Sequence, residues 1–307
     1  MAEGEYEAQR ALEVHIPDNV VHPVAWGLLE DSQNKAFFLA DFINLRARSP
    51  PIAQFFTVLK KLHQSSTSPN GKFGFHVTTF YGAPAMRTEW TDTWEEFFVR
   101  EFRSNLDFAQ KNRGKHPGLQ EVSEKFIETV IPRLLRPLET GGRSIKPTLC
   151  HGDLWDGNIQ IDVDKKRPII FDACCFYGHN ESKDPRYALG PEFIDLYKKE
   201  LGASEPVEDF DDRNALYSMR NDILTAGMWP QWASLLERVK DEMLRLLAKH
   251  PQGFSGFRDL REVNAARVLA NTEVSVAGNY TPYASETITE AGRVSEATQL
   301  LTSGART

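Results

Sequence analysis

The chain has 307 residues, of which 41% are hydrophobic and 26% charged, the composition of a soluble globular protein with one large domain or two smaller ones. With 36 basic and 43 acidic residues, its formal charge of −7 gives no electrostatic support for binding nucleic acid or an anionic membrane. No apolar run approaches the roughly eighteen residues that span a bilayer. The acidic, polar start excludes a secretory signal and argues against an organelle transit peptide, so a cytoplasmic location is expected.

The first part of the chain predicts a helix, two strands and a second helix. Residues 5–15 have one apolar side, as an amphipathic helix requires. Residues 20–29 and 36–45 are typical of strands joined by a polar turn. Pro51 is placed to open a helix that runs through His63 with apolar residues along one stripe.

Longer helices follow. Asp92 is expected to cap a helix that continues through residue 109, with Glu95 three residues on completing the capping pattern. Its aromatic residues are expected to face the core. Residues 119–138 predict another amphipathic helix, broken at Pro132.

The final part predicts helices near 191–201, 212–227 and 230–250. After Gly253 the composition shifts to small and polar residues, and residues 283–307 carry few large apolar side chains. That tail is expected to be loosely docked or disordered.

Three cysteines, Cys150, Cys174 and Cys175, match no disulfide framework and no paired zinc spacing. The adjacent pair is predicted to be buried as small apolar side chains. A reducing compartment is the default.

The most specific chemistry lies in residues 151–158, His-Gly-Asp-Leu-Trp-Asp-Gly-Asn. Kinase-type phosphoryl-transfer enzymes place an Asp, an Asn five residues later and a second Asp after a following strand. Asp153 and Asn158 keep this offset, and the apolar run 168–171 ends in Asp172. A turn and a hairpin formed by 159–161 and 169–171 would bring the three groups to one edge. Each residue alone could be a loop residue capping backbone groups, but the ordered set predicts a phosphotransferase.

These residues resemble the fructosamine-3-kinase and ketosamine-3-kinase family, a branch of the protein-kinase-like and aminoglycoside-phosphotransferase fold. The resemblance is carried by the 151–158 segment with its Trp after Asp-Leu, by the Phe-Tyr-Gly-His run 176–179, and by the upstream stretches 73–75 and 91–98. It covers residues 5–250. It implies an α+β, protein-kinase-like fold with an incomplete N-terminal β lobe and a mostly helical C-terminal lobe. The implied domains are a nucleotide-lobe remnant and hinge (1–45), a catalytic lobe (46–253) and a partly disordered extension (254–307).

The resemblance also implies roles at the catalytic segment. Asp153 would accept the proton of the sugar hydroxyl, and Asn158 and Asp172 would ligate Mg²⁺. Trp155 and His179 would shape the sugar pocket, although a structural histidine is an equal alternative at position 179.

For the nucleotide, the resemblance places the inter-lobe hinge at Asp41, Phe42 and Ile43, whose backbone groups would pair with the adenine of ATP. That role rests on the resemblance, because the residues alone also fit an ordinary strand. Glu7 stands where the family has a helix glutamate that pairs with a strand lysine.

The chain departs from the family pattern at that lysine. The first lysine is Lys35, and residues 1–30 contain only the isolated glycines Gly4 and Gly27, without a glycine-rich loop. Two explanations are open: a shortened form of an active enzyme, or a shortened paralogue that binds without turnover. Weak or no activity is expected of the chain as it stands.

The function implied by the resemblance is ATP-dependent, Mg²⁺-dependent phosphorylation of the C3 hydroxyl of ketosamines, in glycated proteins or small amines, as a deglycation repair kinase. One alternative is a small-molecule kinase of the choline or aminoglycoside type, against which Trp155 and the run 176–179 argue. The other is a pseudokinase-like binding module, which the absent lysine and glycine-rich loop favour.

Overall fold

The structure is a computed structural model that describes residues 1–30, 32–182, 190–261 and 263–264. Residues 1–259 form one unit and residues 260–307 another, so the first unit continues past the boundary expected at residue 253. The tail 283–307 lies outside the described residues.

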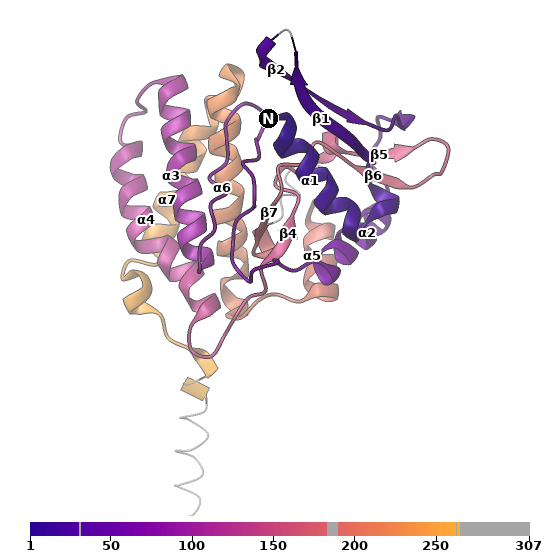
Figure 1. Ribbon diagram of the computed structural model, residues 1–307. Coiled ribbons are helices and arrows are strands. Elements are labelled where there is room, and N and C mark those ends of the chain that lie inside the picture. Colours follow the sequence, from indigo (N-terminus) through magenta and orange to yellow (C-terminus); the bar gives the residue numbers. More distant parts are fainter. Residues whose placement is uncertain (31, 183–189, 262, 265–307) are drawn as a thin grey trace, which may run out of the picture. The chain divides into compact units, whose positions relative to one another are not determined.

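The chain opens with helix α1 (Ala2–His15) and a two-stranded sheet of β1 (Pro23–Leu29) and β2 (Ser32–Ala40). The strands are antiparallel, with Trp26 opposite Phe38. The second strand ends earlier than the sequence predicts, because Leu45 belongs to a separate short strand, β3 (Leu45–Arg46). The expected incomplete β lobe is this hairpin, at the upper right of Figure 1.

Two further small sheets carry the segment around residues 151–172. In one, β5 (Ile159–Asp162) lies between β3 and β6 (Pro168–Ile170). In the other, β4 (Thr148–Cys150) pairs with β7 (Phe176–Gly178). The predicted hairpin is confirmed, with Ile159 opposite Ile170. The residues that follow β4 and β6 therefore come to one place.

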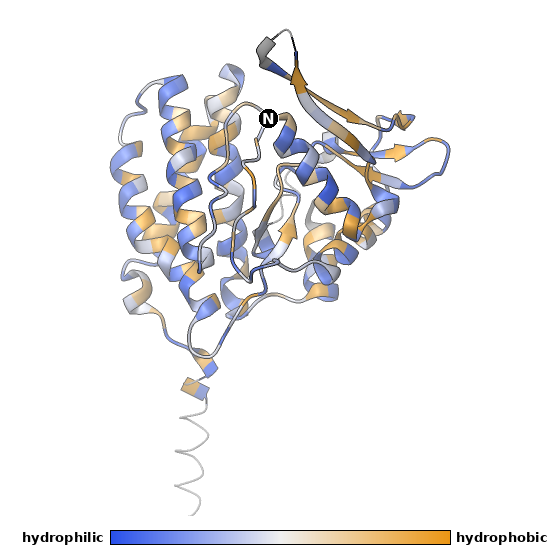
Figure 2. Cartoon of the chain, viewed as in Figure 1, coloured by the Kyte–Doolittle hydropathy of each residue, from blue (hydrophilic) through white to orange (hydrophobic). Residues whose placement is uncertain are grey.

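Six more α-helices occur among the described residues of this unit. They are α2 (Ile52–Ser65), α3 (Trp94–Arg113), α4 (Leu119–Leu135), α5 (Gly190–Leu201), α6 (Phe210–Met228) and α7 (Leu235–Lys249). Helices α3, α4, α6 and α7 pack against one another (Figure 1). Their hydrophilic residues colour the outward-facing turns in Figure 2, as amphipathic helices require. No helix in the described ranges combines the length and apolarity needed to cross a bilayer.

The predicted start of α3 is wrong by one residue. Thr93, not Asp92, caps the helix, and its side chain accepts a hydrogen bond from the Glu96 backbone N–H at 3.2 Å. Asp92 instead pairs with Lys72, Nζ to Oδ1 at 2.8 Å. Both residues can cap, and the backbone path into the helix decides between them.

The predicted break at Pro132 is also wrong, since α4 continues through it to Leu135. A proline inside a helix removes one backbone hydrogen bond. Its neighbours Val130, Ile131, Leu134 and Leu135 are all buried. Their packing near the helix end holds the turn that the proline weakens.

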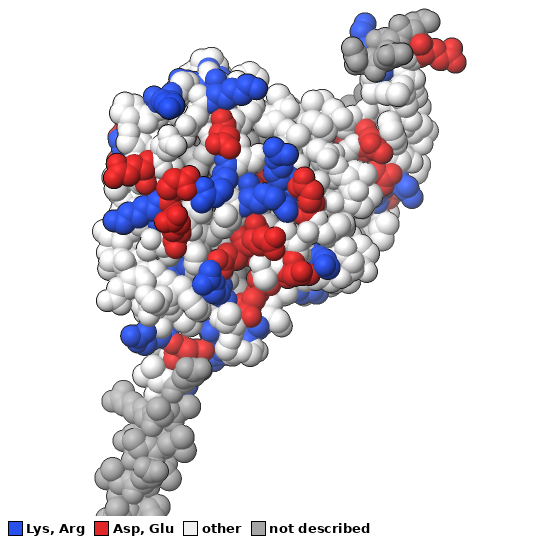
Figure 3. Space-filling view, turned by 60° about the vertical axis from the view of Figure 1, so that its left-hand side comes forward, with Lys and Arg blue, Asp and Glu red and all other residues white. Residues whose placement is uncertain are grey.

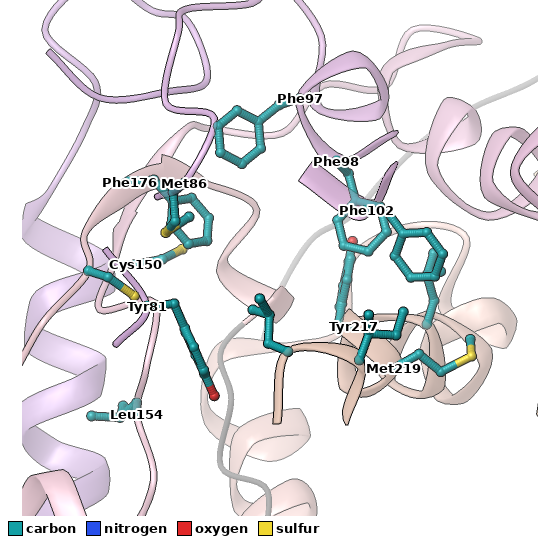
Figure 4. Packing of buried hydrophobic residues seen from close by; sticks show 14 of the residues in the cluster. Tyr81, Met86, Phe97, Phe98, Phe102, Cys150, Leu154, Phe176, Tyr217 and Met219 are labelled. Carbon is teal, nitrogen blue, oxygen red and sulfur yellow. The ribbon is translucent and has the colours of Figure 1, made fainter. Parts of the chain in front are cut away.

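The core is centred on aromatic residues of α3, as the sequence predicts. The Trp94 ring lies 5.4 Å from Phe97 and 6.2 Å from Phe176 of β7, centroid to centroid. Figure 4 shows Phe97, Phe98 and Phe102 among the buried side chains. Cys150, Cys174 and Cys175 are buried as free thiols. This packing joins the helices to the sheet that carries the catalytic segment.

Candidate active site

The segment after β4 turns sharply at Gly152. Its φ is +86°, and a Cβ there would lie 2.2 Å from the carbonyl oxygen of Cys174. The Cys174 backbone N–H donates to the His151 carbonyl at 3.0 Å. Only glycine fits so close an approach in this conformation, and the turn is therefore fixed against the chain that follows β6.

His151 is the second link between these two stretches. Its ring is 3% exposed, with Nε2 3.1 Å from the Phe171 carbonyl oxygen and Nδ1 3.4 Å from the Asp153 backbone nitrogen. Burial lowers the pKa of His151 to about 4, so the ring is neutral at pH 7. It then donates from Nε2 to Phe171 and accepts at Nδ1 from Asp153, a tautomer that orients the segment leading to the Asp153 carboxylate.

Asn158 brings the three predicted groups together. Its Nδ2 donates to the carbonyl oxygen of Asp153 at 2.9 Å, to Oδ2 of Asp153 at 3.2 Å, and to the carbonyl oxygen of Asp172 at 3.5 Å. The β5–β6 hairpin makes this possible, since it returns the chain to Asn158 directly before Asp172. Asp153, Asn158 and Asp172 lie at one site.

Asp172 adopts an unusual backbone conformation, with φ of +59°, at the point where the chain leaves β6. Desolvation by the surrounding protein raises its pKa. Residues held in this region of φ commonly cluster at functional sites.

A second carboxylate, Glu5 of α1, lies within electrostatic range of Asp172. Desolvation, and then the charge of Asp172, raises the pKa of Glu5. Helix α1 is held there by close packing, because a Cβ on Gly4 would lie 2.3 Å from the Thr78 carbonyl oxygen. Two acidic groups with raised pKa values favour a cation between or beside them.

The oxygen groups here suit Mg²⁺, which is bound through one or two carboxylates with water and phosphate oxygens. With Nδ2 of Asn158 turned toward Asp153, its Oδ1 takes part in no hydrogen bond among the described residues. No group of three or more His, Cys, Asp or Glu side chains that could hold a metal occurs in the described part of the chain. The predicted donor set, one carboxylate and one amide oxygen, would leave positions for phosphate oxygens.

Glu7, the residue of α1 that the resemblance singled out, pairs with two other side chains. Its carboxylate lies 3.1 Å from Nε2 of His76 and 3.7 Å from the Arg10 guanidinium. The acidic residue of α1 that interacts electrostatically with Asp172 is Glu5. The sequence analysis did not predict a role for Glu5. The signal that could have found it is the pair of acidic residues two apart in the first turns of α1.

The segment Asp41–Ile43 follows β2 and leads to β3. The Asp41 N–H already donates to the His22 carbonyl at 2.9 Å, so this amide is not available to a ligand. Phe42 is 93% exposed and Ile43 is half-buried. Backbone groups for an adenine would come from the Asp41 carbonyl and from Phe42 and Ile43.

The two predicted pocket residues differ. Trp155 is 45% exposed. A Cβ at position 157 would lie 2.4 Å from its ring, so the indole can occupy this position only because residue 157 is glycine. His179 is fully buried, with Nδ1 2.9 Å from the Tyr217 hydroxyl and Nε2 2.9 Å from the Ser204 hydroxyl. The structure therefore places His179 in the interior, where it has a structural role.

Sequence reasoning also missed Arg220 and Glu101. The Arg220 guanidinium lies 3.4 Å from the Gly152 carbonyl oxygen and 3.7 Å from the buried Glu101 carboxylate. Burial raises the pKa of Glu101, and the positive charge of Arg220 opposes that rise. The pair, from α3 and α6, contacts the turn at Gly152, and no sequence motif marks it.

Small sheets next to a helical lobe, with an Asp–Asn–Asp set at the turn and hairpin, define the class as a protein-kinase-like fold. The solved structure of an aminoglycoside phosphotransferase, in complex with AMP-PNP and hygromycin B, shares this fold at a TM-score of 0.51 and 13% identity, covering 79% of this chain and 82% of that one. A candidate fructosamine-3-kinase from Haemophilus somnus is more similar, with a TM-score of 0.62 and 17% identity over 80% of this chain and 79% of that one.

The protein-family model described as "Fructosamine kinase" matches residues 1–225 of this chain. The chain belongs to the fructosamine kinase family.

Among curated relatives, the chloroplastic protein-ribulosamine 3-kinase of Oryza sativa subsp. indica is 27% identical over 69% of this chain. The ketosamine-3-kinase of Mus musculus is 37% identical over 41% of this chain. The match spans 60% of the rice protein and 38% of the mouse protein. The predicted family and fold are confirmed. The cytoplasmic location stays a prediction, since the rice relative is chloroplastic.

Proposed function

We propose that this protein is an ATP-dependent kinase for the C3 hydroxyl of ketosamines, with glycated proteins or small glycated amines as acceptors. One observation supports the proposal: Nδ2 of Asn158 hydrogen-bonds to Asp153 and to the backbone carbonyl of Asp172, so the proposed base and the two proposed cation ligands are neighbours. The names of the rice and mouse relatives support the substrate class.

In this proposal Asp153 orients the C3 hydroxyl and accepts its proton as the oxygen attacks the γ-phosphorus of ATP. The new bond joins the sugar oxygen to phosphorus, the bond to the β-phosphate oxygen breaks, and ADP leaves. Asn158 and Asp172 would hold Mg²⁺, which would supply charge neutralisation for the phosphate oxygens. Glu5 adds negative charge on the side of α1.

The remaining roles concern binding. The Asp41 carbonyl and the backbone of Phe42 and Ile43 receive the adenine. Trp155, two residues after the proposed general base Asp153, offers an exposed indole that can stack on the apolar face of a sugar. The sugar pocket does not include His179, which lies in the interior. In this scheme residues 1–45 are the nucleotide-lobe part and hinge, and the catalytic lobe extends to Asp259.

The test is transfer of phosphate from Mg·ATP to a synthetic ribulosamine, followed by product mass. Asp153→Asn should lower kcat by about 10²–10⁴-fold, the usual contribution of a general base. Asp164→Asn, which changes an exposed carboxylate in the β5–β6 turn, is the matched control and should leave the rate unchanged. Equal rates for Asp153→Asn and the parent chain would remove the proposal.

A second candidate is a binding module without turnover. Thermal unfolding with Mg·ATP separates the two, because a ligand that binds only the native state raises stability with its concentration. The binding module is supported if Mg·ATP raises the unfolding temperature, Asp172→Asn abolishes that rise, and no phosphate is transferred. A panel with choline and aminoglycosides tests the small-molecule alternative.

A further inference from the structure

Arg220 of α6 is a buried cation behind the turn at Gly152. It is 7% exposed, and its Nη1 donates to the Gly152 carbonyl oxygen at 3.4 Å. This hydrogen bond is long, but the guanidinium carries a full positive charge in a site shielded from water, where its attraction for a carbonyl dipole is strong. No step of the proposed reaction uses Arg220, although it contacts the residue directly before the proposed base Asp153.

The peptide unit between Gly152 and Asp153 is held at both of its polar ends. Arg220 binds its carbonyl oxygen, and its N–H, that of Asp153, donates to Nδ1 of His151 at 3.4 Å. Because the peptide unit is planar, contacts at its two ends fix its rotation. That rotation sets the direction in which the Cα–Cβ bond of Asp153 leaves the backbone, so it directs the carboxylate.

The charge of Arg220 is also felt beside Asp153. Burial raises the pKa of the Cys174 thiol, the charge of Asp153 raises it further, and the charge of Arg220 opposes the rise. A Cβ at Gly152 would lie 2.6 Å from Sγ of Cys174, so this thiol lies against the turn. Arg220 and Asp153 therefore act on a common neighbour.

Glu101 of α3 holds the guanidinium in place. Its side chain is 1% exposed, and Oε2 lies 3.7 Å from Nη2 of Arg220. The Arg87 backbone N–H donates to Oε1, whereas Oε2 makes no hydrogen bond among the described residues. Burial raises the pKa of Glu101, and of the charges that oppose this rise that of Arg220 has the largest effect. The two buried charges therefore depend on each other.

The rest of the guanidinium is enclosed by α6, β7 and the chain that precedes α3. Nη1 also donates to Oδ1 of Asn221 at 2.9 Å, and Nη2 lies 3.6 Å from Sδ of Met86. The rings of Tyr81 and Phe176 lie 5.8 Å and 5.6 Å from the guanidinium carbon. Figure 4 shows Tyr81, Met86 and Phe176 in one cluster. This packing gives the carbonyl of the turn a partner in a fixed position.

We propose that Arg220 is a positioning residue for Asp153, whose carboxylate it orients through the Gly152 carbonyl. The inference rests on the proposed function for the proton transfer, whereas the contact of Arg220 with the turn needs no substrate. Arg220 itself touches neither the sugar nor ATP in this scheme. A shift of about 1 Å in a reacting group can lower the rate on the order of hundredfold.

The kinetic test is Arg220→Met, which keeps much of the side-chain volume and removes the donor. It should lower kcat for phosphate transfer to a synthetic ribulosamine by about 10–100-fold. KM for Mg·ATP and for the ribulosamine should stay within about threefold of the parent values, because the groups that bind them are unchanged. Arg220→Lys keeps the charge without the planar fork and should recover part of the loss.

A second substitution separates positioning from folding. Arg220→Met leaves Glu101 as an unpaired buried charge and should destabilise the fold. Glu101→Gln/Arg220→Met removes that charge, so it should recover part of the stability without recovering kcat. The matched control is the other buried pair of α6, in Glu181→Gln/Arg213→Met, which does not contact the turn. It should keep the parent kcat at temperatures where it is folded.

Hydrogen exchange gives a readout without substrate. The Asp153 amide, which donates to His151, should exchange faster in Glu101→Gln/Arg220→Met than in the parent chain or in Glu181→Gln/Arg213→Met. Amides of the β5–β6 hairpin should keep their rates. Recovery of kcat together with stability in Glu101→Gln/Arg220→Met, or an unchanged exchange rate at Asp153, would overturn the inference. A parent chain without phosphate transfer would contradict the proposed function instead, and the exchange rates would then decide the role of Arg220.

Discussion

His151 carries a neutral imidazole inside the turn between β4 and β5, and its two ring nitrogens bond to different stretches of backbone. Its folded-state pKa of about 4 lies below the unfolded value of 6.5. Between these values the unfolded chain binds more protons than the folded chain. The stabilisation from His151 is therefore complete above pH 6.5 and is lost as the pH falls toward 4.

At the scale of this residue we expect the free energy of unfolding to fall by roughly 3 kcal/mol from pH 7 to pH 4 on account of His151 alone. Urea unfolding of His151→Gln at several pH values should show lower stability at pH 7 and a flatter dependence on pH. His76→Gln, which also changes an exposed histidine, is the control and should keep the parent slope. Parallel profiles for the parent and His151→Gln would contradict the assignment of a buried neutral ring.

At the scale of elements, the turn between β4 and β5 depends on close approach to the segment that follows β6. Gly152 has the backbone conformation that glycine favours and also faces the Cys174 carbonyl. Gly114, which ends α3, has a similar φ of +82° but nothing within 4 Å of a Cβ. Substituting alanine at each position therefore distinguishes the cost of backbone strain alone, at Gly114, from strain combined with a steric clash, at Gly152.

We expect Gly114→Ala to cost about 1–3 kcal/mol, because φ of +82° with ψ of 174° is a backbone conformation that only glycine adopts readily. Gly152→Ala should cost more than about 3 kcal/mol, since the added Cβ meets backbone that must move. It should also abolish phosphate transfer at temperatures where the variant remains folded. Chemical denaturation of both variants measures the difference, and similar losses would mean that the turn yields easily.

At the scale of the whole molecule, a buried polar network joins the sheet that carries the site to the helices. Arg213 of α6 is fully buried and donates to Glu181 at 2.8 Å and to the carbonyls of Pro206 and Ser204, each at 2.8 Å. In contrast, the Arg245–Glu242 ion pair lies at the surface, where both side chains are accessible to water. The face shown in Figure 3 carries acidic and basic side chains side by side.

Arg213→Met should destabilise the fold by roughly 3–5 kcal/mol, because Glu181 is left as an uncompensated buried charge. Adding Glu181→Gln should recover part of that loss, since it removes the charge. Arg245→Met should cost less than about 1 kcal/mol, as exposed pairs do. Thermal and urea unfolding of the three variants would measure this, and no recovery in the double variant would point to lost packing.

That Asp153, Asn158 and Asp172 lie close together could be predicted from the sequence because their contacts are local. Asp153, Asn158 and Asp172 lie within one turn and one hairpin, and the strand pattern fixes how that hairpin closes. The helices were also visible, since apolar stripes reflect the side that each buries. The errors at Asp92 and Pro132 arose where neighbouring residues offer equivalent local solutions and packing chooses between them.

What the sequence alone determined is the proximity of these three residues, the family and the order of most helices and strands. Only the tertiary structure decided that Glu5 rather than Glu7 shares the environment of Asp172, that His179 is interior, and that Arg220 and Glu101 support the turn. These contacts join residues far apart along the chain, and no periodicity records them. They depend on how α1, α3 and α6 pack around the sheets, which is set by the whole core at once.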